Sequence, residues 1–360
     1  MGKNYVKMKE FDREVTEKAK VIAVMNNKGG CGKTTTAMAL GMYLTRTGNN
    51  VLMWDNDPQS NLTQRLGLPD DKKKDARLHH LFKYPEQKPD ISLIAEYPYL
   101  QRIPGTNEGV GKIGVMPGSH YSESYADELD GRFKRFGGMF QEDTGYTSIY
   151  HFFSERINHY KKFYNYIVMD TAPALEGNIL NQLAVRVADE IIYPVDGLDA
   201  ALGIRQILNW MDVQTAPLDK KPNGLFAMVK YQMETKGVET YDNDLMSRNT
   251  VYRALKKVFG DFVCDNGVRE LKSIRHATKG LPGFGGKTDY TVLSEEIINR
   301  QLTERNNLFD YIKQDSVIKD LESKLSVIAK KVRKRKPQFK TPKYLNLPPR
   351  QEAIINEGTY

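Results

Sequence analysis

Short runs of apolar residues recur along the chain, and stretches with helical spacing separate most of them. Strands that alternate with helices are typical of a parallel sheet covered on both faces. Several runs, such as Tyr166-Ile167-Val168-Met169, are apolar nearly throughout, which indicates burial on both sides. The runs that we predict as strands cover residues 21–25, 51–55, 91–95, 112–116, 166–170, 190–195, 224–230 and 262–264.

This pattern predicts an α/β fold with a mostly parallel, twisted sheet and helices on both faces. Residues 1–19 are charged and are predicted as a short leader or helix, and residues 20–333 as one domain. Within that domain, residues 98–146 are rich in Gly, Pro and charge. We predict an insertion there that holds one strand and one helix, and the helix covers residues 121–136. The basic tail, residues 334–360, is predicted as disordered.

The chain has 360 residues, with 53 lysines and arginines against 45 acidic residues and a net charge of +8. This basic excess fits a nucleic-acid or an anionic-membrane partner and decides for neither. Only two cysteines occur, which argues against a disulfide framework and favours a reducing compartment. No run approaches the ~20 apolar residues of a membrane span, and the N-terminus lacks the apolar core of a signal peptide. We therefore expect a cytoplasmic protein.

A glycine-rich segment, Asn26-Asn27-Lys28-Gly29-Gly30-Cys31-Gly32-Lys33-Thr34-Thr35, lies between the first apolar run and a helical stretch. Glycines let successive backbone N–H groups turn toward one point, and the helix adds its free N–H groups and positive dipole end. Lys33 supplies charge for the β- and γ-phosphates, and the Thr34 hydroxyl can ligate Mg²⁺. These residues predict a phosphate-binding loop. We interpret Cys31 as a small side chain that fits the loop rather than as a redox group.

The ordinary phosphate-loop pattern has a glycine where this chain has Asn27, and Lys28 is an added lysine. The pattern K-G-G-x-G-K-T-T resembles the deviant Walker A box of the ParA/MinD ATPases. The resemblance implies a P-loop NTPase-like fold, ATP and Mg²⁺ as ligands, and an ATP-dependent sandwich homodimer in which Lys28 reaches the second subunit's nucleotide. It also implies catalytic roles for Lys28, Lys33 and Asp57. The nucleotide-binding residues that it implies are Lys28, Gly29, Gly30, Cys31, Gly32, Lys33, Thr34 and Thr35.

The second apolar run ends in Asp55-Asn56-Asp57-Pro58-Gln59-Ser60-Asn61, which resembles the family's D-x-D-P-Q-x-N box. A carboxylate at the carboxyl end of a strand beside the phosphate-loop strand lies at the ligand crevice of such a sheet. The resemblance implies that Asp57 positions the attacking water and that Asp55 lies near the magnesium ion. The alternative is that the segment is a helix N-cap with Pro58 in the first turn.

The run at 166–170 ends in Asp170-Thr171-Ala172-Pro173, an apolar strand followed by a carboxylate. This arrangement is typical of a Walker B site, in which an aspartate holds Mg²⁺, here through water. The segment resembles the family's D-T-x-P box and follows the other two boxes in the family's order. We therefore predict a metal site at Thr34, Asp55 and Asp170.

Residues 262–269 lie where ParA proteins carry a strand and an Asn-Val-Arg element that contributes nucleotide and DNA contacts, although Gly267 interrupts the element here. Basic side chains crowd the window that follows, and the alternative to a DNA-binding face is a solvated charged face. The predicted DNA contacts are Arg269, Lys272, Arg275 and Lys279.

The resemblance as a whole implies a ParA-type ATPase for plasmid or chromosome partitioning. The ATP-bound dimer would bind non-specific DNA, and a ParB-like centromere-binding protein would stimulate the hydrolysis that releases it. The expected location is the cytoplasm, in association with the nucleoid.

The alternative is a MinD-like ATPase that acts at a membrane surface through an amphipathic helix at its end. The amphipathic stretch here, residues 316–332, lies before the tail, so we expect it to pack on the core instead. Its apolar stripe consists of Val317, Leu321, Leu325, Ile328 and Val332. The nitrogenase iron-protein branch needs paired cysteines for an iron–sulfur cluster, and Cys31 and Cys264 are too few.

Overall fold

The computed structural model describes residues 5–6, 19–67, 78–87, 93–95, 111–219, 221–229, 243–268, 289–301, 307–312 and 315–335. The strands are β1 (Tyr5–Val6), β2 (Lys20–Val24), β3 (Val51–Asp55), β4 (Leu93–Ala95), β5 (Ile113–Met116), β6 (Tyr166–Asp170), β7 (Glu190–Val195) and β8 (Asn223–Met228). The helices are α1 (Lys33–Arg46), α2 (Asn61–Arg65), α3 (Leu78–Lys83), α4 (Ser122–Thr144), α5 (Ile149–Tyr160), α6 (Ile179–Val187), α7 (Leu198–Leu202), α8 (Ile204–Thr215), α9 (Asn243–Phe259), α11 (Asp289–Gln301), α12 (Leu308–Ile312) and α13 (Asp315–Arg335). A single 3-10 turn, η1 (Gly260–Phe262), follows α9.

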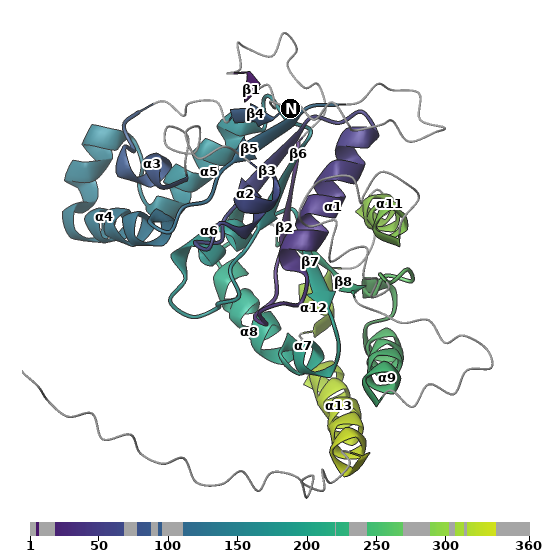
Figure 1. The fold of residues 1–360 in the computed structure, drawn as a ribbon. Helices are drawn as coiled ribbons and strands as arrows, with labels where there is room; N and C mark the ends of the chain where they lie inside the picture. Colours follow the sequence, from purple (N-terminus) through teal and green to yellow (C-terminus); the bar gives the residue numbers. More distant parts are fainter. Residues whose placement is uncertain are drawn as a thin grey trace, which may run out of the picture.

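The described strands form one sheet in the order β1-β4-β5-β3-β6-β2-β7-β8 (Figure 1). Neighbouring strands from β5 to β8 are all parallel, whereas β4 pairs antiparallel with both β5 and β1. The strand before the glycine-rich loop, β2, lies between β6 and β7. Because β3, β6 and β2 run in the same direction, their carboxyl ends meet at one edge. The predicted α/β fold with a mostly parallel sheet is confirmed.

Each face of the sheet carries its own apolar core. In β2, Val21 and Ala23 belong to one core, whereas Ile22 and Val24 belong to the other, because successive side chains of a strand point to opposite faces. Residues of α5, α6 and α8 contribute to the first core, and residues of α1, α2 and α11 to the second. Burial on both faces explains why the strands are apolar nearly throughout.

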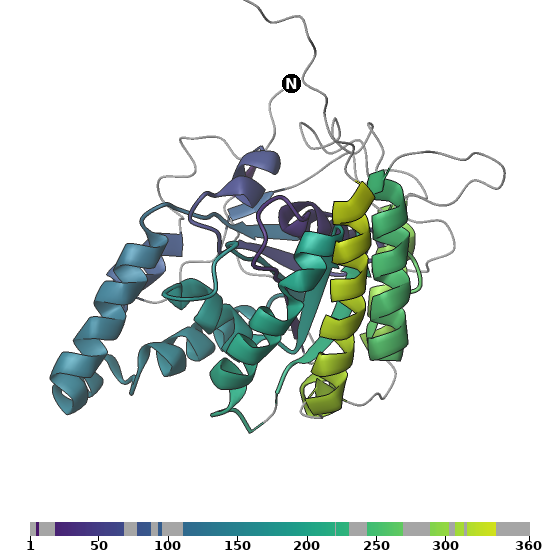
Figure 2. The ribbon, with the colours of Figure 1, turned by 90° about the horizontal axis from the view of Figure 1, so that it is seen from below.

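The last described helix, α13, packs along α9, and the two lie side by side in both views (Figures 1 and 2). Four residues of the predicted stripe are buried: Val317, Leu321, Leu325 and Ile328. The side chain of Val332 lies outside the described residues. The expectation that this helix packs on the core is therefore confirmed. Among the described residues, no helix combines the length and the apolar character that crossing a bilayer requires.

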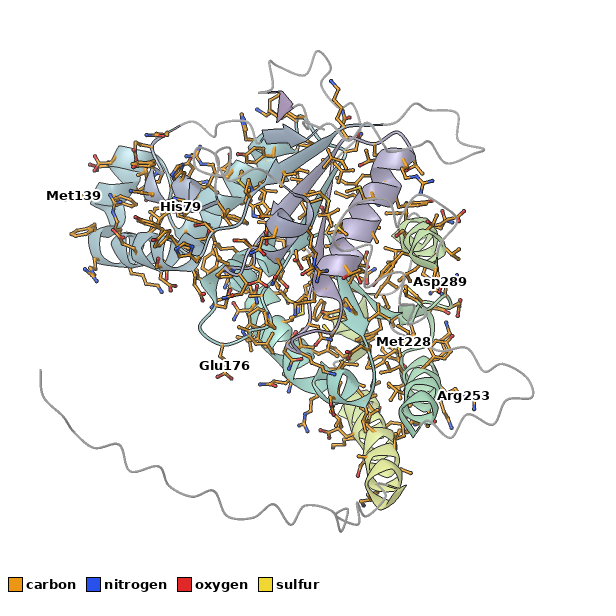
Figure 3. The ribbon with its side chains drawn as sticks, viewed as in Figure 1. His79, Met139, Glu176, Met228, Arg253 and Asp289 are labelled. Carbon is orange, nitrogen blue, oxygen red and sulfur yellow. The ribbon has the colours of Figure 1, made fainter. Side chains whose placement is uncertain are left out.

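The predicted insertion contains β5 and α4, and α4 packs against α3 at the β5 side of the sheet (Figure 1). The helix expected at 121–136 is confirmed, but it continues to Thr144 across a kink at Gly137, whose φ is 40°. Glycine tolerates this left-handed conformation, which other residues avoid. Met139, just past the kink, is 71% exposed at the outer edge of this helix pair (Figure 3).

Two details differ from the predicted elements. Residues 1–19 were predicted as a leader or helix, yet Tyr5–Val6 forms an edge strand on β4. The strand predicted at 262–264 is reduced to a single bridge from Val263 to Phe226. The ladder is interrupted after Cys264 because the backbone N–H groups of Asp265 and Asn266 donate to Glu296 of α11, and contact with β8 resumes only where the Val268 N–H donates to the Met228 oxygen.

Candidate functional site

The glycine-rich loop lies at the carboxyl end of the central strand, β2, and α1 begins within it at Lys33. Gly30 and Gly32 have φ values of 74° and 93°, in the left-handed region that glycine adopts without strain. Gly32 is the N-cap of α1, and no side chain caps the helix. The first N–H groups of α1 and its positive dipole end therefore point into the loop, as phosphate binding requires.

The two lysines of the loop have different environments. Lys33 is buried, and its Nζ donates to the backbone oxygen of Lys28 at 3.0 Å. The Lys28 side chain is 33% exposed, and its Nζ forms an ion pair with Asp196 Oδ1 at 3.0 Å. Lys33 is thus directed into the loop of its own chain, whereas Lys28 is held at the surface by the residue after β7.

Polar contacts fix the first half of the loop to β7. Asn26 Nδ2 donates to the Pro194 backbone oxygen at 2.8 Å, and its Oδ1 accepts from the Lys28 backbone N–H at 2.9 Å. Cys31 is fully buried in an apolar core, and neither described cysteine forms a disulfide. This burial agrees with the interpretation of Cys31 as a packing residue.

Asp55 and Asp170 are direct partners in the register of β3 and β6. Both are fully buried, and no hydrogen bond of regular geometry reaches either carboxylate oxygen of Asp170 from the described part of the chain. Burial raises the pKa of Asp170 well above its usual value, and the charge of Asp55 adds to the effect. The Thr34 hydroxyl and the charge of Lys33 lower the pKa of Asp170, so both groups lie close to it.

Asp55 is engaged by the protein itself. Its Oδ2 accepts from the Thr63 backbone N–H at 2.8 Å and also from the Thr63 hydroxyl. Burial raises the pKa of Asp55 to about 7, against the lowering effect of these two hydrogen bonds. A Cβ at Gly118 would lie 2.8 Å from the Asp55 carboxylate carbon, so the chain needs glycine there. Asp55 therefore ties β3 to the start of α2 and to the segment after β5.

Asp57 is buried and holds a tight turn. Its Oδ1 accepts from the Gln59 N–H at 2.9 Å, and its backbone oxygen accepts from Ser60 at 2.8 Å. The N-cap of α2 is Ser60, not Asp57. Asp57 therefore forms a turn before the helix and does not cap it. Among the described non-glycine residues, Ser60 alone has a positive φ, 54°. Such strained backbone is common in segments that contact ligands.

The residues present fit a magnesium ion. Mg²⁺ prefers oxygen ligands and keeps several waters beside one or two carboxylates and substrate phosphates. Asp170 offers two buried oxygens without hydrogen-bond partners among the described residues, and Thr34 lies beside it. The described residues contain no cluster of three or more His, Cys, Asp or Glu side chains suited to a metal ion. A magnesium ion here would therefore need the nucleotide's own oxygens.

The segment after η1 is held by one glutamate of α11. Glu296 accepts from the backbone N–H groups of Asp265 and Asn266 at 2.6 and 2.8 Å, and from Asn266 Nδ2 at 2.8 Å. The Asn266 side chain is exposed, and Glu296 holds it at the surface. The predicted DNA contacts, Arg269, Lys272, Arg275 and Lys279, lie outside the described residues.

Two residues beside the loop were not identified from the sequence. Asp196 follows the apolar strand β7, the same signal that identified Asp55 and Asp170, and it could have been found in that way. Arg65, at the end of α2, donates from Nη1 to the Thr35 hydroxyl at 2.7 Å. A basic residue at the end of a short helix carries no sequence signal of this kind.

Comparison with known proteins places this geometry in a family. A family model described as an AAA domain matches residues 19–221, more than half of the chain. The chromosome partitioning protein ParA of Caulobacter vibrioides is 26% identical over 298 residues, which cover 78% of this chain and 95% of that protein. A protein of Sinorhizobium fredii described as a replication protein A is 38% identical over 110 residues, but the match spans only 26% of that protein and 30% of this chain.

Solved structures share the fold. Cobyrinic acid a,c-diamide synthase of Mycobacterium smegmatis, solved with an ATP analogue and magnesium, superposes with a TM-score of 0.54 at 18% identity, over 80% of this chain and 98% of that one. The pNOB8 ParA bound to nonspecific DNA has a TM-score of 0.50 at 22% identity, over 80% of this chain and all of that one. Because these two proteins differ in activity, the likeness shows the fold alone. From the family match and the ParA relative, we conclude that this chain belongs to the AAA domain family as a ParA-type P-loop ATPase.

Proposed function

We propose that this ATPase partitions DNA by means of an ATP-dependent sandwich dimer. The observation that carries the proposal is the position of Lys28. Its side chain is partly exposed at the edge of the sheet where the carboxyl ends of β2, β6 and β7 meet, whereas Lys33 faces into its own loop. A lysine at this surface can reach the phosphates of a nucleotide held by a second copy, and ATP would then lie between the two subunits.

In this proposal, Lys33 and the N–H groups at the start of α1 bind the β- and γ-phosphates. Thr34 and Asp170 would hold magnesium, which supplies charge neutralisation at the phosphates when bound. Asp57 orients the attacking water, and Asp55 keeps α2 beside the site through Thr63. The ATP analogue and magnesium in one structural neighbour support these ligands.

The ATP dimer would bind non-specific DNA, and a ParB-like protein would stimulate its release. Net charge of +8 and the DNA-bound ParA neighbour support this part of the proposal. Each phosphate contact on duplex DNA contributes about −0.9 to the slope of log affinity against log salt. A dimer with a few basic contacts per subunit should therefore give a slope of several units.

The experiment is to measure binding to duplex DNA of unrelated sequences and to anionic liposomes, with ATP and Mg²⁺, with ADP and without nucleotide. We expect salt-sensitive, sequence-independent DNA binding that requires ATP. Equal DNA affinity with and without nucleotide would refute the proposal that DNA binding requires ATP. Binding to liposomes and not to DNA would favour the MinD-like alternative, against which the packing of α13 on α9 already argues.

A further inference from the structure

The guanidinium of Arg65 lies over the beginning of α1. Arg65 ends α2, which packs beside α1 (Figure 1), and its Nη1 donates to the Thr35 hydroxyl at 2.7 Å. Thr35 is the third residue of α1, so its N–H is one of the free groups at the helix start. This contact brings a permanent positive charge to the phosphate-binding end of the helix.

The described neighbours of Arg65 do not neutralise that charge. Within the described part of the chain, no carboxylate forms an ion pair with Arg65, although an arginine presents five N–H donors. The neighbouring aromatic residue is Tyr290 of α11, whose pKa burial raises to about 12 while the charge of Arg65 acts in the opposite direction. A partly buried guanidinium with spare donors beside an anion-binding helix end is suited to a phosphate oxygen.

The order of residues along α1 indicates which phosphate this is. Lys33 serves the β- and γ-phosphates, and Thr34 lies at the metal site beside Asp170. Thr35 comes next along the helix, farther from the γ-phosphate, and the loop as a whole cradles the α- and β-phosphates. A cation fixed on Thr35 therefore faces the α-phosphate side of the nucleotide.

We propose that Arg65 is a further nucleotide-binding residue that contacts the α-phosphate and is aimed there by its hydrogen bond to Thr35. The inference rests on the proposed binding of ATP in the glycine-rich loop. It also gives α2 a function: the helix would connect a bound nucleotide, through Arg65, to the Asp57 turn that precedes it. ADP and ATP share the α-phosphate, so Arg65 should serve both.

The test is the dissociation constant for ATP and for ADP, each with Mg²⁺, of wild type, Arg65→Gln, Arg65→Lys and Thr35→Val. A hydrogen bond to a charged group stabilises by about 1.5–3 kcal/mol, so Arg65→Gln should weaken both nucleotides about 10- to 100-fold. Arg65→Lys, which keeps the charge, should recover part of this loss. Arg253→Gln, on the outer face of α9 (Figure 3), is the matched control for removing an arginine and should bind like wild type.

Thr35→Val separates nucleotide binding from simple bracing of α2. It removes the hydrogen bond and keeps the guanidinium, so it should weaken binding only a few-fold. Equal losses of binding for Thr35→Val and Arg65→Gln, together with a fall in the melting temperature of nucleotide-free Arg65→Gln, would show that Arg65 acts only as a brace of α2. A loss for ATP with ADP unchanged, or no loss for either, would overturn the α-phosphate contact. Failure of wild type to bind either nucleotide would instead refute the proposed function.

Discussion

Lys28 Nζ lies 3.0 Å from Asp196 Oδ1, so the lysine proposed to act across a dimer is held by a carboxylate of its own chain. The two residues are 168 positions apart, and β2 and β7 bring them together as parallel neighbours. Asp196 is mostly buried, whereas Lys28 is one-third exposed. A lysine cannot pair fully with Asp196 and with a second subunit's nucleotide at the same time, so the proposed dimer would compete with this ion pair.

Asp196→Asn should lower the ATP concentration at which dimers form. Partly exposed ion pairs contribute up to about 1 kcal/mol, so we expect a shift of about two- to five-fold. The measurement is light scattering during titration with a non-hydrolysable ATP analogue. Asp199→Asn, an exposed acid three residues away on α7, is the control. If Asp196→Asn needs more ATP than wild type, Asp196 positions Lys28 for the dimer rather than restraining it.

Asp57→Asn should slow ATP hydrolysis about 10²-fold and leave ATP affinity within about two-fold. The asparagine keeps an oxygen to accept from the Gln59 N–H, so the turn is retained while the charge is removed. Single-turnover hydrolysis and nucleotide titration measure the two quantities. Turnover close to that of wild type would leave Asp57 with a turn-forming role alone.

Asp170→Asn should stabilise the metal-free protein while abolishing Mg²⁺-dependent hydrolysis. The pKa of Asp170 is raised by burial and that of Asp55 is about 7, so the folded state holds these protons more tightly than the unfolded chain. The contribution of these two carboxyl groups to stability is therefore fully present at acid pH, and it is lost as the pH rises through their raised pKa values. Asp170→Asn removes one of the two buried groups that must ionise, and with it part of the stability lost at neutral pH.

Melting temperatures at pH 5 and pH 7.5, without nucleotide or metal, measure this effect. The variant should melt about 2–5 °C above wild type at pH 7.5, and the difference should shrink at pH 5. Asp143→Asn, an exposed acid on α4, is the control and should show no such trend. A variant less stable than wild type at pH 7.5 would mean that other groups in the fold offset the cost of burying the charged Asp170 carboxylate.

The sequence was most informative where burial is complete. β3, β6 and β7 were predicted with their observed bounds, and β2 to within one residue, because strands buried on both faces are apolar throughout. β1 was missed because two residues on an edge strand leave no periodicity to detect. The bridge at Val263 was predicted as a longer strand because the sequence does not show that Glu296 takes the next backbone N–H groups.

The same distinction applies to the site. The glycine pattern and the strand-ending acids could be predicted because each lies in one continuous segment. The contacts of these residues could not, because they join different elements: Lys28 with Asp196, and Thr35 with Arg65. The register of the strands and the packing of α2 beside α1 determine which side chains meet.

The most direct test is the molar mass in solution of wild type, Lys28→Ala and Lys33→Ala, measured by size-exclusion light scattering with and without a non-hydrolysable ATP analogue and Mg²⁺. Wild type should shift from about 41 kDa to twice that mass when the analogue is added. Lys33→Ala should lose nucleotide binding and remain monomeric, whereas Lys28→Ala should bind the nucleotide as a monomer. A Lys28→Ala protein that dimerises with the analogue as wild type does would contradict the cross-subunit role of Lys28.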